Sequence, residues 1–136
     1  MKKLILISTI IIFALTSCKK NTNNKVSISD TTIMSFVDTI YDFGKVIEGE
    51  KVNYTFKFKN TGDKPLLISQ VSTSCGCTAS SYTDSPVKPN SEGYVKITFN
   101  SSGRQGNVQK TITVYSNTKP SEHILIIKGY VDNTTN

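Results

Sequence analysis

The stretch Val52-Asn53-Tyr54-Thr55-Phe56-Lys57-Phe58-Lys59 decides the fold of this 136-residue chain. Its apolar and polar residues alternate strictly, so the even-numbered side chains share an apolar face and the odd-numbered ones share a polar face. Because successive side chains of a β-strand point to opposite sides, this pattern predicts an antiparallel strand with one buried face and one solvated face. We expect Phe56 and Phe58 to point into the core and Lys57 to point into solvent.

The same alternation recurs further along the chain, where Val95, Ile97 and Phe99 are separated by polar residues. Residues 111–115 and 124–131 are also rich in β-branched and aromatic residues, and the second run is expected to be the more fully buried. Clusters of turn-forming residues separate these runs, at 48–50, 60–65, 88–93, 101–103 and 117–120. This spacing predicts an all-β fold, an immunoglobulin-like β-sandwich of about seven antiparallel strands.

The first 18 residues form a three-part pattern. Two lysines precede an apolar run over residues 4–15, and Leu15-Thr16-Ser17-Cys18 closes it. This three-part order is that of a signal peptide, and the apolar run is too short to span a bilayer comfortably. The ending resembles the bacterial lipobox, which implies lipid attachment to Cys18 and cleavage before it. We therefore predict a lipoprotein signal peptide at residues 1–17; the alternative is an ordinary cleaved signal in which Cys18 has no role.

Residues 19–25 contain no apolar side chain, so they cannot bury surface that would offset the entropy of ordering them. We expect residues 18–34 to be a lipidated flexible tether, residues 35–132 to be the sandwich domain and residues 133–136 to be a C-terminal tail. Lipidation at Cys18 would anchor the protein to a membrane of the bacterial cell envelope, facing the periplasm. Disulfides can form and persist there.

Charge and composition exclude several functions. The chain has a net charge of +6, but its lysines are spread along the sequence and Arg104 is its only arginine. Nucleic-acid-binding domains gather such residues into patches, so no nucleic acid is expected as a partner. The lysines are interpreted as solvated strand faces and edge protection. With His123 as the only histidine and no nucleophile-elbow motif, no catalytic residue is assigned.

The segment Cys75-Gly76-Cys77-Thr78 carries the strongest local chemistry. Two thiols this close can form a small disulfide loop, bind the soft ion Cu(I), or stay reduced, and the residues leave these alternatives open. A disulfide here would stabilise the fold little, because so short a loop restricts the unfolded chain little, and strained geometry would make it readily reducible. Met34 and His123 are the only other candidate ligands for a soft metal, and no metal site is assigned.

Together these features resemble the bacterial family called domain of unknown function 1573, frequent in Bacteroidetes lipoproteins. That family is similar to the immunoglobulin-like group found in ciliary and centrosomal proteins and in the major sperm protein. The resemblance implies an immunoglobulin-like sandwich and marks Cys75 and Cys77 as the special site, but it implies no defined activity. It covers most of residues 36–131, through the segments 41–50, 54–62, 65–68, 74–78, 95–99, 112–117 and 125–129.

The sequence thus predicts a non-enzymatic domain, anchored to a membrane of the cell envelope, that binds or scaffolds an envelope protein. No cofactor is expected for this function. The alternative is a thiol-redox or copper-handling protein that uses Cys75-Gly76-Cys77, for which Cu(I) would be the cofactor.

Overall fold

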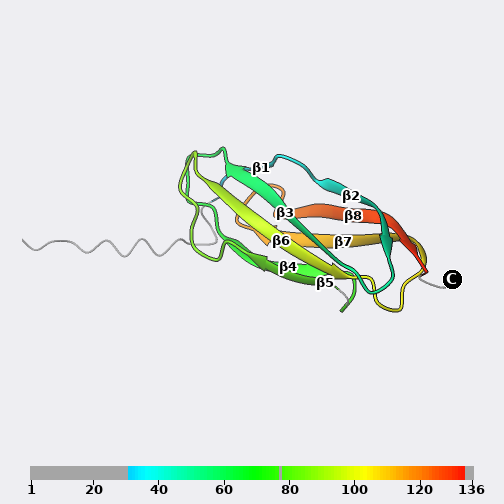
Figure 1. The fold of residues 1–136 in the computed structure, drawn as a ribbon. Coiled ribbons are helices and arrows are strands. Elements are labelled where there is room, and N and C mark those ends of the chain that lie inside the picture. The colour runs from blue at the N-terminus through cyan, green and yellow to red at the C-terminus, as the bar shows by residue number, and fades with distance from the viewer. Residues whose placement is uncertain (1–30, 77, 134–136) are drawn as a thin grey trace, which may run out of the picture.

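The computed structural model describes residues 31–76 and 78–133, which form two β-sheets packed face to face (Figure 1). The described residues contain no helix, and hence none that could cross a membrane. This architecture confirms the predicted all-β sandwich. Its eight strands are β1 (Met34–Phe36), β2 (Ile40–Ile47), β3 (Lys51–Asn60), β4 (Ile68–Thr73), β5 (Thr78–Tyr82), β6 (Glu92–Asn100), β7 (Gly106–Ser116) and β8 (Glu122–Asp132).

Several expectations concern residues outside those described: the signal peptide, lipidation of Cys18, most of the tether and the end of the tail. They stay predictions. The folded part begins slightly earlier than the alternating pattern indicates. Thr32 and Met34 are already buried, and Thr32 forms a bridge with Thr118.

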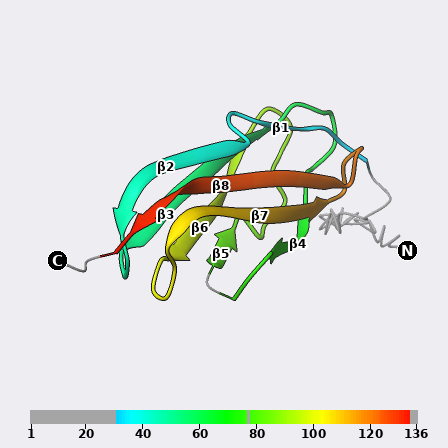
Figure 2. The ribbon, with the colours of Figure 1, turned by 90° about the vertical axis from the view of Figure 1, so that its right-hand side faces the viewer.

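One sheet has the strand order β1-β3-β6-β5, and the other has the order β2-β8-β7-β4. The chain passes between the sheets in the short segment 37–39, which separates β1 from β2 (Figure 2). Neighbouring strands are antiparallel except β2 and β8, which pair in parallel. About seven antiparallel strands were expected; the described residues form eight, and the pairing of β2 with β8 is parallel. β2 and β8 lie far apart in the sequence, so no hairpin turn forces them to run in opposite directions.

The core lies between the sheets and confirms the register predicted for residues 52–59. Phe56 and Phe58 are almost completely buried, whereas Lys57 is exposed. Gly93 pairs with Phe58 across the β3–β6 ladder, and a β-carbon at Gly93 would collide with the Phe58 ring. The remaining apolar core comes mainly from β6, β7 and β8 and includes Val95, Ile97, Phe99, Ile112, Val114, Leu125, Ile127 and Val131.

The expectation that residues 124–131 are more fully buried is wrong. Leu125, Ile127 and Val131 are buried, but Ile124 and Tyr130 face outward. β8 is an interior strand of its sheet, yet only the inner face of that sheet is covered by the other sheet. Half of its side chains therefore stay in contact with solvent, as in other antiparallel sandwiches.

A buried asparagine organises one end of the sandwich. The Asn60 side chain donates to the carbonyl oxygens of Lys64 at 2.7 Å and Val87 at 2.9 Å. Its own carbonyl oxygen accepts from the Thr32 hydroxyl at 2.9 Å and the Gly62 amide at 3.1 Å. Asn60 is fully buried. These four hydrogen bonds satisfy its polar atoms and tie together three segments that are distant in sequence.

Two further features hold the start of the domain in place. The Thr32 amide donates to the carbonyl oxygen of Asn117 at 3.0 Å, and the Asn117 side chain bonds Leu67 and Pro65. Gly62 lies so close to Thr32 that a β-carbon there would collide with the threonine hydroxyl. The segment that leads into β1 is therefore held by both Asn60 and Asn117.

We expect Asn60→Ala to lower the free energy of unfolding by about 2–4 kcal/mol, because it removes four hydrogen bonds at once and leaves the buried Thr32 hydroxyl without the acceptor it bonds. Chemical denaturation followed by circular dichroism measures the change. Asn53→Ala is the matched control, since Asn53 is exposed and bonds only Thr98; it should cost less than about 0.5 kcal/mol. Equal losses in the two variants would contradict a central role for Asn60.

Candidate functional site

The turn that contains Cys75 joins the two sheets at one edge of the sandwich. It connects β4 to β5, which are edge strands of different sheets and lie next to each other (Figure 2). The turn thus carries the chain directly from one layer to the other. Its location follows from the topology and could not be read from the spacing of the cysteines.

Hydrogen bonds hold the backbone of this turn. Ser74 and Thr111 exchange two of them: the Ser74 amide donates to the Thr111 carbonyl at 3.0 Å, and the Ser74 hydroxyl accepts from the Thr111 amide at 3.1 Å. The Thr73 hydroxyl lies 3.2 Å from the carbonyl oxygens of both Cys75 and Thr78. These contacts fix the turn through groups other than the thiols.

Cys75 is half-buried and disulfide-bonded, and its sulfur lies 3.6 Å from the Thr78 hydroxyl. Cys77 is outside the described residues, so its pairing with Cys75 stays a prediction. Thr73 pairs with Ile112 and Ser74 bonds Thr111, so the chain leaves the β4–β7 ladder just before Cys75.

Neither of the other proposed soft ligands is close to this turn in the strand register. Met34 pairs with Asn60 in the other sheet, and His123 pairs with Val114 towards the far end of β7. The His123 ring hydrogen-bonds the Thr118 hydroxyl at 2.8 Å, and burial lowers its pKa. Within the described part of the chain, no three His, Cys, Asp or Glu side chains form a group that could hold a metal ion.

The outer face of the β2–β8–β7–β4 sheet carries an apolar cluster that sequence reasoning missed. Ile40 of β2 pairs with Ile126 of β8, and Ile124 lies two residues earlier on the same face. Ile40 is 53% exposed and Ile124 is 48% exposed. We call Ile40, Ile124 and Ile126 the isoleucine patch. Reading residues 124–131 with a period of two, and not as a buried run, would have identified two of its members.

A shallow depression of about 460 Å³ lies beside the isoleucine patch, where the pairing of β2 with β8 shifts between Asp42 and Lys45. Charged groups around it are paired. Lys128 lies 4.0 Å from Asp42, and Lys45 lies 2.7 Å from Asp132. The hydrogen bond to Asp132 and its charge raise the pKa of Lys45, and the same contact lowers the pKa of Asp132. The depression is lined by Asp42, Gly44, Asn107, Val108, Gln109, Lys128, Gly129 and Tyr130.

The outer face of the β1–β3–β6–β5 sheet is different, because lysines dominate it. Lys51, Lys57 and Lys59 lie on β3, and Lys96 lies on β6. All four are exposed, as expected for solvated strand faces. The expectation that such lysines protect sheet edges is wrong for Lys57, Lys59 and Lys96, which have strand neighbours on both sides, whereas Lys51 lies where β3 has only β6 beside it.

These observations define an immunoglobulin-like β-sandwich whose first strands belong to different sheets, with two chemically distinct outer faces. The family model described as "Protein of unknown function (DUF1573)" matches residues 34–131. The chain therefore belongs to this family, as the resemblance in its sequence indicated.

Solved structures share the fold at low sequence identity. A protein of unknown function from Porphyromonas gingivalis W83 has a TM-score of 0.65 at 18% identity, over 80% of this chain and 51% of that one. The ASH/PapD-like domain 7 of human CEP192 has a TM-score of 0.63 at 12% identity, covering 77% of this chain and 89% of that domain. The Escherichia coli chaperone DraB has a TM-score of 0.52 at 13% identity, over 77% of this chain and 57% of that one.

These likenesses show the fold alone. The chain spans about half the length of the Porphyromonas gingivalis protein. None of the curated proteins compared with the chain matches it.

Proposed function

We propose that this protein is a non-catalytic binding domain, held by a lipid on Cys18 at a membrane of the bacterial cell envelope, facing the periplasm. It binds an envelope protein through the isoleucine patch. The observation that carries this proposal is the exposure of Ile40 and Ile124, both next to Ile126, on the outer face of one sheet that also exposes Ile47 and Tyr130. Contiguous exposed apolar surface with a polar rim is typical of protein-binding sites.

The surroundings of the isoleucine patch suit such a contact. Thr111 and Thr113 of β7 pair with Ile126 and Ile124 and extend the uncharged surface. The pair of Lys128 and Asp42 borders it on one side. Fully burying one isoleucine contributes about 1.5–3 kcal/mol, so covering two half-exposed ones would contribute a few kcal/mol to binding.

Replacing the patch should abolish capture of the partner. We expect Ile40→Ser with Ile124→Ser to remove the protein that is crosslinked to the wild-type domain in intact envelopes, because the substitutions remove the apolar contact area. Crosslinking, affinity purification and mass spectrometry measure the loss. Asn53→Ser with Thr55→Ser on the opposite sheet is the control and should leave capture unchanged. Retention of the same partner by the patch variant would refute this site.

Anchoring is tested separately. We expect Cys18→Ser to prevent lipidation, and therefore to release the protein from the membrane fraction or to trap its uncleaved precursor. Fractionation of cells, with mass measurement of the N-terminal peptide, distinguishes these outcomes. Normal membrane retention of a processed Cys18→Ser protein would contradict lipid anchoring.

A second candidate function is thiol redox chemistry or copper handling at Cys75 and Cys77. The disulfide bond of the only partly buried Cys75 favours it, since accessible disulfides are the more readily reduced ones. Two thiolates also suit Cu(I). Thiol titration and metal analysis of the purified protein, with and without reductant, detect either chemistry.

Replacing both Cys75 and Cys77 with alanine separates the two candidates. Under the binding function, we expect the variant to keep its fold and its captured partner. Under the redox or copper function, it keeps its fold and loses thiol reactivity or metal binding together with its activity. Melting should change little in either case, because the loop is short and the bonds of Thr73 and Ser74 hold the turn. A large fall in melting temperature would contradict both.

A further inference from the structure

We propose that the outer face of the β1–β3–β6–β5 sheet binds an anionic lipid surface. We call Lys51, Lys57, Lys59, Lys96 and the exposed ring of Tyr94 the lysine face. In the β3–β6 ladder, Lys57 pairs with Tyr94, and Lys96 pairs with Thr55 two residues before Lys57. The cations are therefore concentrated on two neighbouring strands of one sheet. The proposal depends on the proposed lipid anchor only for bringing this face near a membrane.

The lysine face is not neutralised by the protein itself. The described residues contain three ion pairs, Lys45–Asp132, Lys128–Asp42 and Lys64–Asp63. None of them involves a member of the lysine face. The two outer faces thus differ, since the lysines on β2 and β8 have carboxylate partners and those on β3 and β6 do not.

One acidic residue lies on this face: Glu92 pairs with Lys59 in the register, without forming a salt bridge. The fold does not require lysine at these positions, because Asn53, Thr55 and Thr98 occupy equivalent outward positions on the same two strands. Edge protection does not account for Lys57, Lys59 and Lys96 either, since strands lie on both sides of them. An external anion would complement the four positive charges.

The shape and chemistry of the face favour a lipid surface over other anions. It is the outside of a sheet, with a small depression of about 200 Å³ at its β5 side, a shape that suits a broad bilayer surface. Its cations are lysines, which act as hydrated point charges on flexible stems, whereas planar, bidentate recognition uses arginine. Tyr94 is 45% exposed among them, and tyrosine is enriched at the headgroup level of membranes.

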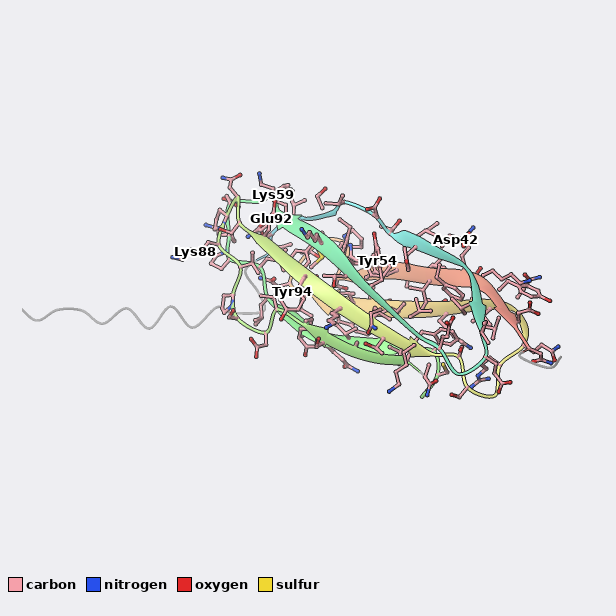
Figure 3. The ribbon with its side chains drawn as sticks, viewed as in Figure 1. Asp42, Tyr54, Lys59, Lys88, Glu92 and Tyr94 are labelled. Carbon is pink, nitrogen blue, oxygen red and sulfur yellow. The ribbon has the colours of Figure 1, made fainter. Side chains whose placement is uncertain are left out.

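The first described residues lie at the same end of the sandwich as part of the lysine face. Thr32 bonds Asn60, the residue after Lys59, so the first described residues and Lys59 are close together. Figure 3 shows Lys59, Glu92 and Lys88 at one end of the molecule, with Tyr94 further along the same face. A lipid attached upstream at Cys18 would bring this end towards the bilayer.

The test uses the chain from Lys19 onward, which keeps every described residue; within them the core is continuous and no buried side-chain polar atom lacks a partner. Sedimentation measures its binding to phosphatidylcholine vesicles with and without phosphatidylglycerol, at low and high salt. We expect binding only to the anionic vesicles, weakened by salt. Each lysine near an anionic surface contributes about fivefold in affinity, so Lys57→Gln/Lys59→Gln/Lys96→Gln should bind about 100-fold more weakly.

A charge-matched control separates a specific face from net charge. Lys45→Gln/Lys119→Gln/Lys128→Gln removes the same charge elsewhere and should bind within a few-fold of the wild type. Equal losses in the two variants, wild-type binding by the lysine-face variant, or equal binding of the wild type to both vesicle types would overturn the proposal. A lysine-face variant that loses the crosslinked envelope protein but still binds vesicles would also overturn the proposal. Capture through the isoleucine patch is measured independently, so either proposal can fail alone.

Discussion

The buried side chain of Asn60 is the interaction on which the rest of the sandwich depends. Its amide group donates twice and accepts twice, and so links β3 to the segment before β1 and to the loops at residues 64 and 87. Neither a carboxylate nor a hydroxyl offers this set of donors and acceptors. Because an unpaired buried polar group is costly, losing these four contacts should destabilise this end of the sandwich.

Once that end is closed, each sheet buries one face and leaves the other free to differ. The outer face of β2 and β8 combines isoleucines with paired charges, whereas the outer face of β3 and β6 carries lysines without salt bridges. The turn at Cys75 lies on the edge where β4 and β5 meet. In the proposed arrangement, one face meets lipid headgroups and the opposite face meets a protein. Such a division suits a domain tethered to a membrane.

Sequence reasoning succeeded where the signal was local. The alternation over residues 52–59 correctly placed Phe56 and Phe58 inside and Lys57 outside. It failed for residues 124–131, where several consecutive apolar residues hid the same alternation. It also identified Asn60 and Gly62 only as parts of a family pattern and a turn. Their roles as a buried hydrogen-bonding centre and a close contact with Thr32 depend on segments about 28 residues away.

The sequence by itself determined the all-β class, the family and the inward or outward direction of the clearest strands. These properties follow from a period of two within a few residues, or from short motifs. Only the tertiary structure decided which strands are interior, that β2 runs parallel to β8, and that Ile40 lies beside Ile126. It also decided which lysines have carboxylate partners. Strand order and cross-strand neighbours arise from contacts between residues far apart in the chain, which a local pattern does not specify.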